Sequence, residues 1–435
     1  MSDRGITWHQ LLIFTSEAEF SAEGAPGQAI SPTSVRIKRH SDHGSSFLDP
    51  LLIGNAAIFN TAKGNYVGNF LFNFQTGAFG GSDLTMYGRH LFENHTIVDW
   101  DLAEVPWPVI WAARDDGVLL SCTYDPATGT LAWARHETTG KVKRVRVIPE
   151  GTEDAVYLVV DRFWGAFMER MESRFVSDVK SAVFLDAAVV YDGRNTGITS
   201  VQVSPEAFTL NFGPGDPVTV TSGPTGIFTA ANVGDAIVIE PDGIAVRIRL
   251  TEFVSTFAMR GILDEALPET YQNLATMLWG LAKGTMTGLD HLNLLNVTML
   301  ADGAVQGPFV AAAGAAGPLD PPAVRIVAGL SYNSDAELLD VAAPSEKTSV
   351  KAIVRMIWEV VASRGLWTGE DFDHLKEWIQ REVEDSFENP PLVTQQVEVP
   401  LEAHWNTGGR AVIRQVDPLP LTVVAGIREI VVGGR

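Results

Sequence analysis

The sequence predicts a mainly β fold built from antiparallel meanders. Three short apolar runs, rich in Val, Leu, Trp and Tyr, lie at Val109–Ala113, Val118–Tyr124 and Thr130–Arg135. These residue types favour a pleated, half-buried surface. Asp-Asp-Gly at 115–117 separates the first two runs, and Asp-Pro-Ala-Thr-Gly at 125–129 separates the second two. Both are turn signals, and regular short strands joined by tight turns are typical of barrels, sandwiches or propeller blades.

Similar runs precede and follow this module. Before it, strands are expected at Gln10–Phe14, Glu19–Ser21, Val35–Arg39, Leu51–Asn60 and Tyr66–Phe74. Val35–Arg39 alternates apolar and basic residues, as a half-buried strand does. Ser82 and Asp83 precede Leu84–Glu93, which is expected to be a short capped helix. After the module, strands are expected at Lys141–Ile148, Ala155–Arg162, Ala166–Glu172, Ala182–Leu185 and Val189–Tyr191.

The amino-acid composition of the chain changes after Asp192. Residues 193–260 are dense in Gly, Pro, Thr and Val and predict a small all-β insert. Its strands are expected near Phe208–Phe212, Val218–Ser222, Ala236–Glu240 and Ala245–Leu250. The glycines do not form a phosphate loop, because no Gly-Lys-Ser or Gly-Lys-Thr follows them.

The last third returns to strand patterns with a few ambiguous segments. Strands are expected at Val297–Leu300 and Ala304–Val305, joined by Asp302-Gly303, and at Val324–Ala328, Val393–Pro400, Arg410–Gln415, Leu421–Ala425 and Ile427–Val432. Pro268–Lys283 is expected to be partly helical, because its leucines are close to a helical stripe. Ser349–Val361 fits a strand or a helix, and Phe372–Phe387 has helical spacing but many charges.

Composition limits the classes of function. The chain has 435 residues and is 46% hydrophobic, so it is expected to be globular. Its formal net charge of −21 is unlike that of proteins that bind the phosphates of nucleic acids. Its single cysteine, Cys122, excludes a disulfide within the chain and a cysteine-based zinc site. Cys122 lies in a strand pattern and is expected to be a buried, inert thiol. No apolar run reaches about 18 residues, so no membrane span is expected.

Several segments resemble one known family. His90–Asp99 and Trp111–Gly117 resemble the tail nozzle proteins of short-tailed bacteriophages (podoviruses), also called tail tubular protein B. Matches in the same order are Leu11–Thr15 with Glu19-Phe20, Gly288–Leu292 with Leu300–Gly303, and Asp417–Val423. They occur in the family's order at positions spread across most of the chain. The region before Leu11–Phe14 is shorter than is usual in the family, so the resemblance leaves open whether one chain closes a propeller.

The resemblance implies a structural virion protein without a catalytic site or cofactor. Its fold would be a β-propeller-like body with a small inserted all-β domain, divided as body 1–192, insert 193–270 and body 271–435. Six copies would form a ring in the virion tail, below the adaptor protein that joins portal to tail. Genomic DNA would leave through the bore, and tail fibres are a further candidate partner. Assembly would take place in the host cytoplasm, without membrane insertion.

The charge fits a conduit. Six chains would carry six times −21, or −126, and an acidic wall repels phosphates, so duplex DNA is expected to slide past without tight binding at physiological salt. A solvated outer surface explains the acidity equally well.

Two basic segments are candidate channel or docking residues. Lys141, Lys143, Arg144 and Arg146 form the densest positive run. They are interpreted either as an exposed strand edge protected by charge or as a docking patch for an acidic neighbouring subunit or adaptor. Arg36, Lys38 and Arg39 alternate in a way that suits a strand facing a channel.

A glycan-binding or glycan-cleaving tail protein is the alternative hypothesis. Glycosidases use two carboxylates across a cleft, and Asp99, Asp101, Glu104, Asp115 and Asp116 are candidates. Asp115 and Asp116 are better explained as a turn. Trp107, Trp111 and Trp133 could stack on sugars, although Trp111 and Trp133 are expected to pack between sheets.

A metal site is conceivable at His40-Ser41-Asp42-His43. A polar loop is the favoured interpretation, because no third ligand lies nearby in the sequence.

Overall fold

The computed structural model describes residues 4–7, 11–25, 29–64, 66–73, 78–173, 175–176, 178–197, 199–206, 211–240, 242–243, 245–341, 349–380, 391–402 and 404–433. Within these residues the protein is mainly β, with 54% in strands and 4% in helices, as the sequence predicted. None of the described helices is long and apolar enough to cross a membrane. The chain divides into two compact units, Met1–Arg174 (unit 1) and Phe175–Arg435 (unit 2).

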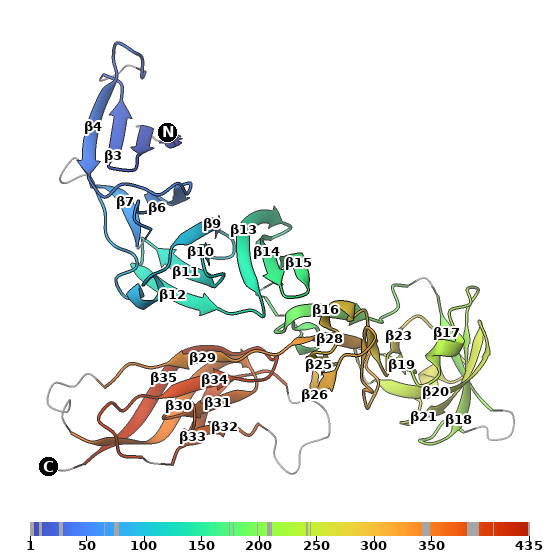
Figure 1. Cartoon of the computed structure of the whole chain (residues 1–435). Coiled ribbons are helices and arrows are strands. Elements are labelled where there is room, and N and C mark those ends of the chain that lie inside the picture. Colours follow the sequence, from blue (N-terminus) through green and yellow to red (C-terminus); the bar gives the residue numbers. More distant parts are fainter. Residues whose placement is uncertain are drawn as a thin grey trace. The chain divides into compact units, whose positions relative to one another are not determined.

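Unit 1 consists, in its described part, of four antiparallel sheets that follow one another along the chain (Figure 1). The first meander holds β1 (Arg4–Thr7), β2 (Leu11–Phe14), β3 (Glu19–Glu23) and β4 (Arg36–Ser41); the second holds β5 (Leu51–Ile53), β6 (Ala56–Asn60), β7 (Val67–Asn73) and β8 (Ala78–Gly80); the third holds β9 (Ile97–Ala103), β10 (Val109–Arg114), β11 (Leu119–Asp125) and β12 (Thr130–His136); the fourth holds β13 (Lys141–Glu150), β14 (Glu153–Arg162) and β15 (Gly165–Arg170).

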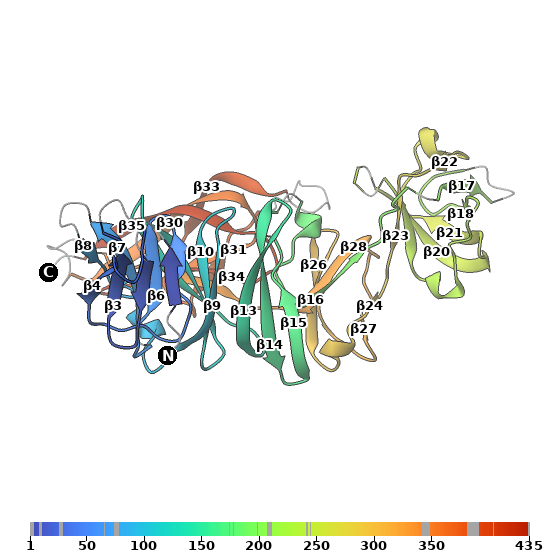
Figure 2. The same cartoon turned by 90° about the horizontal axis from the view of Figure 1, so that it is seen from above.

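The four meanders pack face to face in chain order (Figure 2). On β10, Ile110 and Ala112 pack toward the second meander, whereas Val109, Trp111 and Ala113 pack toward the fourth. On β6, Ile58 packs toward the third meander and Phe59 toward the first. β6 and β10 are therefore buried along their whole length, because both faces of their sheets are covered.

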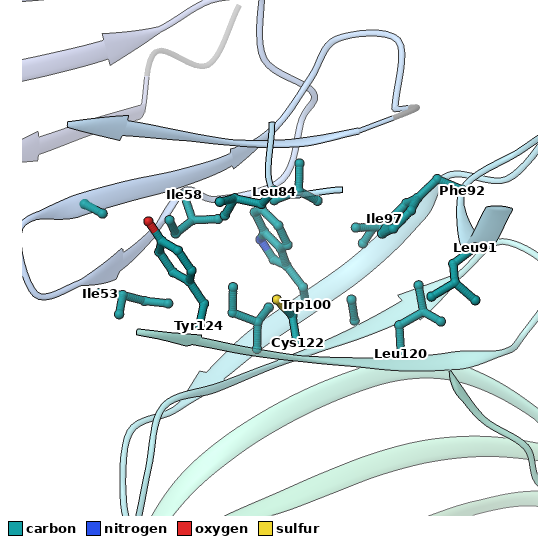
Figure 3. Packing of buried hydrophobic residues seen from close by; sticks show 14 residues of the cluster. Ile53, Ile58, Leu84, Leu91, Phe92, Ile97, Trp100, Leu120, Cys122 and Tyr124 are labelled. Atoms are coloured by element: carbon teal, nitrogen blue, oxygen red, sulfur yellow. The ribbon is translucent and has the colours of Figure 1, made fainter. Parts of the chain in front are cut away.

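Figure 3 shows the core between the second and third meanders. Ile58 of the second meander shares this core with Trp100, Leu120 and Cys122 of the third, and Tyr124 lies at one end. The Asn69 side-chain amide donates to the Tyr124 hydroxyl at 2.8 Å, which satisfies a polar group inside this apolar layer. Successive stacked meanders are typical of propeller blades, but closure of the stack around an axis stays a prediction.

The central hairpins of unit 1 form as predicted. β10 pairs with β11 across Asp115-Asp116-Gly117, and β11 pairs with β12 across residues 125–129. Gly117 has a φ of 96°, and a Cβ on it would overlap Lys141, so glycine is required at this turn.

Three predictions in unit 1 are wrong in detail. Leu51–Asn60 is a hairpin rather than one strand, because the chain turns at Gly54 with a φ of 57°. Leu84–Glu93 is a series of turns with one short 3-10 helix, η1 (Arg89–Leu91), rather than a capped helix. The strand predicted at Val35–Arg39 forms as β4, but it is an edge strand whose residues 36–39 are all exposed, so it is not half-buried.

Unit 2 contains the remaining described strands. They are β16 (Asp186–Asp192), β17 (Val201–Pro205), β18 (Pro217–Ser222), β19 (Ala236–Ile239), β20 (Val246–Ser255), β21 (Ala258–Leu263), β22 (Ala275–Thr276), β23 (Trp279–Ala282), β24 (Met286–Thr287), β25 (Asn296–Ala301), β26 (Ala304–Val310), β27 (Ala315–Ala316), β28 (Arg325–Leu330), β29 (Ser334–Glu337), β30 (Lys351–Ser363), β31 (Leu366–Gly369), β32 (Leu375–Glu377), β33 (Val393–Pro400), β34 (Val412–Gln415) and β35 (Thr422–Val432). Short 3-10 helices are η2 (Val179–Ser181), η3 (Ala230–Asn232), η4 (Glu269–Tyr271) and η5 (Asp290–Leu292).

The region of the predicted insert forms a nearly closed, barrel-like sheet of seven strands in the order β22-β17-β18-β21-β20-β19-β23. Its two outermost strands, β22 and β23, are separated by only Met277 and Leu278 in the chain. Val220, Ile237, Ile248 and Met259 fill its core. The predicted insert of 193–270 stops short of β22 and β23, although both pair with strands inside it.

The chain enters and leaves this barrel-like sheet side by side. β16 pairs with β28, placing Tyr191 opposite Ile326, in the sheet β16-β28-β25-β26. The backbone N–H of Gly193 donates to Val324, and that of Lys283 donates to Ala323. Entry and exit points that lie beside one another are typical of a domain inserted into a loop.

The C-terminal strands form two sheets with one apolar core between them. The sheet β29-β34-β31-β32 and the sheet β33-β30-β35 share a cluster that includes Met356, Trp358, Leu366, Val397 and Ile413. The ambiguous segment Ser349–Val361 is strand β30, and the two strands predicted at Leu421–Ala425 and Ile427–Val432 are one strand, β35.

The segments of unit 2 with helical spacing form little helix in the part of the chain that the structure describes. Pro268–Lys283 contains only η4 before β22 and β23. Described residues of Phe372–Phe387 form β32 and irregular chain, and residues 381–387 lie outside the described part.

Two strand predictions in unit 2 also differ from the structure or fall outside it. Ala182–Leu185 follows η2 as irregular chain rather than a strand. Most of the strand predicted at Phe208–Phe212 lies outside the described residues.

Candidate functional site

Two carboxylates join the third and fourth meanders. The Asp99 carboxylate on β9 accepts from the backbone N–H of Val145 at 3.0 Å, and the Asp101 carboxylate accepts from that of Val147 at 2.8 Å. β9 and β13 are the edge strands of their sheets. Alternate residues of a strand point the same way, so residues 99 and 101 match the alternate amides of β13. The carboxylates thereby satisfy edge amides that would otherwise lack partners.

Among the described residues, one cation of the basic run on β13 has an ion-pair partner and three have none. Arg146 donates to both Asp99 oxygens, at 2.7 and 2.8 Å, and this interaction raises the pKa of Arg146. Lys141, Lys143 and Arg144 are exposed and have no ion-pair partner among the described residues. The edge of β13 is therefore closed by aspartates rather than protected by its own charges, whereas three cations remain open to solvent.

The second candidate basic segment lies on a different meander. Arg36, Lys38 and Arg39 are exposed on β4 at the edge of the first meander. The second and third meanders separate this strand from β13 in the stack. The structure therefore does not combine the two basic segments into one site.

The carboxylates proposed for glycan cleavage have structural partners. Asp99 and Asp101 bind the backbone of β13, and Asp115 and Asp116 form the predicted turn. Glu104 is exposed. Trp111 is buried between the third and fourth meanders, and the Trp133 indole N–H donates to the Leu84 carbonyl at 2.8 Å. Trp107 is half exposed.

A histidine between two aspartates is the arrangement that sequence reasoning missed. His95 Nδ1 lies 3.0 Å from Asp115 Oδ1, and Nε2 lies 3.6 Å from Asp116 Oδ2. One ligand atom from each residue could face a common metal ion. The sequence offered one hint of this cluster. His95 lies in His90–Asp99, and the two aspartates lie in Trp111–Gly117, the two segments that resemble nozzle proteins.

Arg114 already occupies much of this cluster. Its guanidinium pairs with both oxygens of Asp116 and donates to the Leu91 carbonyl at 2.6 Å. The hydrogen bond from Arg114 lowers the pKa of Asp116 to about 2. A cation bound to the same carboxylate disfavours a metal ion. The arrangement instead connects the loop around Leu91 to the 115–117 turn through Arg114.

The two histidines near residue 40 do not form a ligand pair. His40 Nε2 lies 2.7 Å from the Ser21 hydroxyl, and its ring packs against Phe70 and Phe79. Burial lowers the pKa of His40. His43 packs edge-on against Tyr66 instead, so this segment does not gather ligands as a metal site would.

Cys122 is fully buried in β11, as predicted. Burial raises the pKa of its thiol to about 12. The neutral thiol is a poor nucleophile, so Cys122 contributes to packing.

No family model matches the chain, and no curated protein matches it.

Proposed function

We propose that the chain is a structural virion protein, a tail nozzle subunit that forms a ring below the portal-adaptor assembly and contributes to the DNA ejection channel. The observation that carries the proposal is the stack of four meanders in unit 1, whose inner strands β6 and β10 are buried on both faces. Blade-on-blade packing of this kind suits a propeller-like body. The resemblance of His90–Asp99 and Trp111–Gly117 to nozzle proteins adds the virion role.

Other features support the same proposal. The chain leaves the sheet β16-β28-β25-β26 after β16, forms the barrel-like sheet and returns to the first sheet at β25, as the resemblance implies for an inserted domain. The charge of −21 suits passage of DNA without capture. Asp99 and Asp101, the leading pair for glycan cleavage, bind backbone amides instead. The proposed partners are other copies of the chain, the adaptor protein and tail fibres.

The mass of the assembled protein tests this proposal. Light scattering of purified chain, alone and with adaptor protein, is expected to give about 283 kDa for the chain's own assembly, six times 47.1 kDa. A chain that remains at 47.1 kDa under both conditions would contradict the ring.

A further inference from the structure

The fourth meander has one open face. Its inner face packs on the third meander through Val145 and Leu158. On the opposite face, the strand register places Arg144, Val159 and Met168 in one row. Val159 is 36% exposed and Met168 is 77% exposed, so this row is apolar at its centre and open to solvent.

Positive charge lies along one side of the same face. Arg144 and Lys141 belong to it, and Lys143 is the extra residue at the β-bulge of β13. The exposed Asp161 lies opposite Lys141, so three cations stand beside one carboxylate. Within the described residues none of the three has an ion-pair partner. Unpaired cations gathered on one strand are notable in a chain with a net charge of −21. We call this surface, defined by Lys141, Lys143, Arg144, Val159 and Met168, the cationic face.

The three-stranded sheet β33-β30-β35 has an open face of opposite charge. Its inner face packs through Met356, Trp358 and Val397. On the outer face, the register aligns Glu398, Ile357 and Ile427 in one row, and Ile427 is 56% exposed.

Carboxylates surround that apolar row. Glu398 and Glu429 share Arg355, at 2.6 and 2.7 Å. Glu359 is exposed and has no ion-pair partner in the described part of the chain. Three glutamates against one arginine leave this surface negative. We call it the acidic face, defined by Arg355, Ile357, Glu359, Glu398, Ile427 and Glu429.

We propose that the cationic face of one copy packs on the acidic face of a second copy. Sheets pack face to face at about 10 Å, with side chains interdigitating. Val159 and Met168 would then be covered by Ile357 and Ile427, while Lys141, Lys143 and Arg144 would meet the glutamates. Complementary charge of this kind fixes the partner and the register.

The contact is head-to-tail. Each chain carries each face once, so one copy offers its cationic face to the next and its acidic face to the previous one. Contacts of this type close into rings or grow into filaments. The inference rests on the proposed function, because it names the contact between subunits of the proposed ring.

Cross-linking between two variants that each gain one exposed cysteine tests the contact. Met168→Cys and Ile427→Cys each place one exposed thiol on one face, and the native Cys122 is buried. A bis-maleimide that spans about 10 Å, the spacing of packed sheets, is expected to link the two variants into dimers when they are mixed. Either variant alone should yield at least about tenfold less dimer, because head-to-tail contacts place unlike faces together.

Charge-reversal variants distinguish cross-linking within a specific contact from cross-linking by random collision of chains. Lys141→Glu with Arg144→Glu, placed in the Met168→Cys chain, is expected to lower the dimer yield at least about fivefold, because like charges then face each other. Glu359→Lys with Glu398→Lys in the Ile427→Cys chain should restore it. Arg36→Glu with Arg39→Glu on β4 is the matched control, with the same change in charge and no expected loss. Circular dichroism checks that every variant is folded.

The outcomes distinguish this inference from the proposed function. A mixture that yields no more cross-linked dimer than either variant alone would overturn the contact between copies. A sixfold ring without cross-links at these positions would also overturn it and leave the proposed function standing. Cross-linked copies that grow as open filaments would support the contact and contradict the ring, and uncross-linked monomers would contradict both.

Discussion

Replacing Asp99 with alanine is expected to lower the free energy of unfolding of unit 1 by about 2–4 kcal/mol. The Asp99 side chain is 9% exposed, accepts from the buried Val145 N–H and pairs with Arg146. Alanine would leave that N–H without an acceptor inside the junction between β9 and β13. Asp99→Asn should cost less, because an amide oxygen can still accept from Val145. Denaturant unfolding followed by tryptophan fluorescence measures the change.

Glu104→Ala is the control for this change. Glu104 lies just after β9 and is exposed, so its loss should alter stability by no more than about 0.5 kcal/mol. Equal stability of the Asp99→Ala and Glu104→Ala proteins would mean that the carboxylate does not hold the third and fourth meanders together.

Trp358→Ala is expected to destabilise unit 2 by about 3–5 kcal/mol. Trp358 is 2% exposed and is among the largest fully enclosed side chains of the described core. Its indole N–H donates to the Thr368 hydroxyl at 3.0 Å. Its ring covers Gly426 on β35 so closely that a Cβ there would overlap it. Alanine would open a cavity between the two C-terminal sheets and leave the Thr368 hydroxyl without this donor.

The matched control is Trp405→Ala, since Trp405 is 55% exposed. Its loss should change stability by about 0.5 kcal/mol or less. Thermal unfolding of both variants under one condition provides the comparison. A shift for Trp358→Ala no larger than that for Trp405→Ala would contradict the packing described for the two C-terminal sheets.

Local turn chemistry made the meanders predictable. Asp-Asp-Gly at 115–117 places glycine where φ is positive, and the flanking apolar runs fill two layers of core. Leu84–Glu93 shows the opposite case. Its leucines were assigned to a helix, but Asp83 accepts from the backbone N–H and the hydroxyl of Thr85. This local hydrogen bonding competes with helix formation. Leu84 and Phe92 reach the core from turns, and Leu91 reaches it from η1.

Tertiary pairing overrode a second helical pattern. The leucines of Pro268–Lys283 have nearly helical spacing, yet Leu274 and Leu278 are exposed. Trp279–Ala282 pairs with β19, and Ala275–Thr276 pairs with β17. These partners lie tens of residues away, so periodicity alone could not reveal them.

The candidate sites depend on distant partners for the same reason. The alternation of Asp99 and Asp101 on one strand face was visible in the sequence, but their partners on β13 were not. His95 meets Asp115 and Asp116 only because the chain folds back between β9 and β10. The cationic residues of β13 were identified in advance, whereas their apolar neighbours Val159 and Met168 required the register of the sheet.

Symmetry-averaged electron cryomicroscopy of the assembled protein tests the central claim most directly. The proposed function predicts a ring of six chains around an open central channel wide enough for duplex DNA. Particles without rotational symmetry, or a symmetric assembly with no channel along its axis, would contradict a role as the nozzle of a DNA ejection channel.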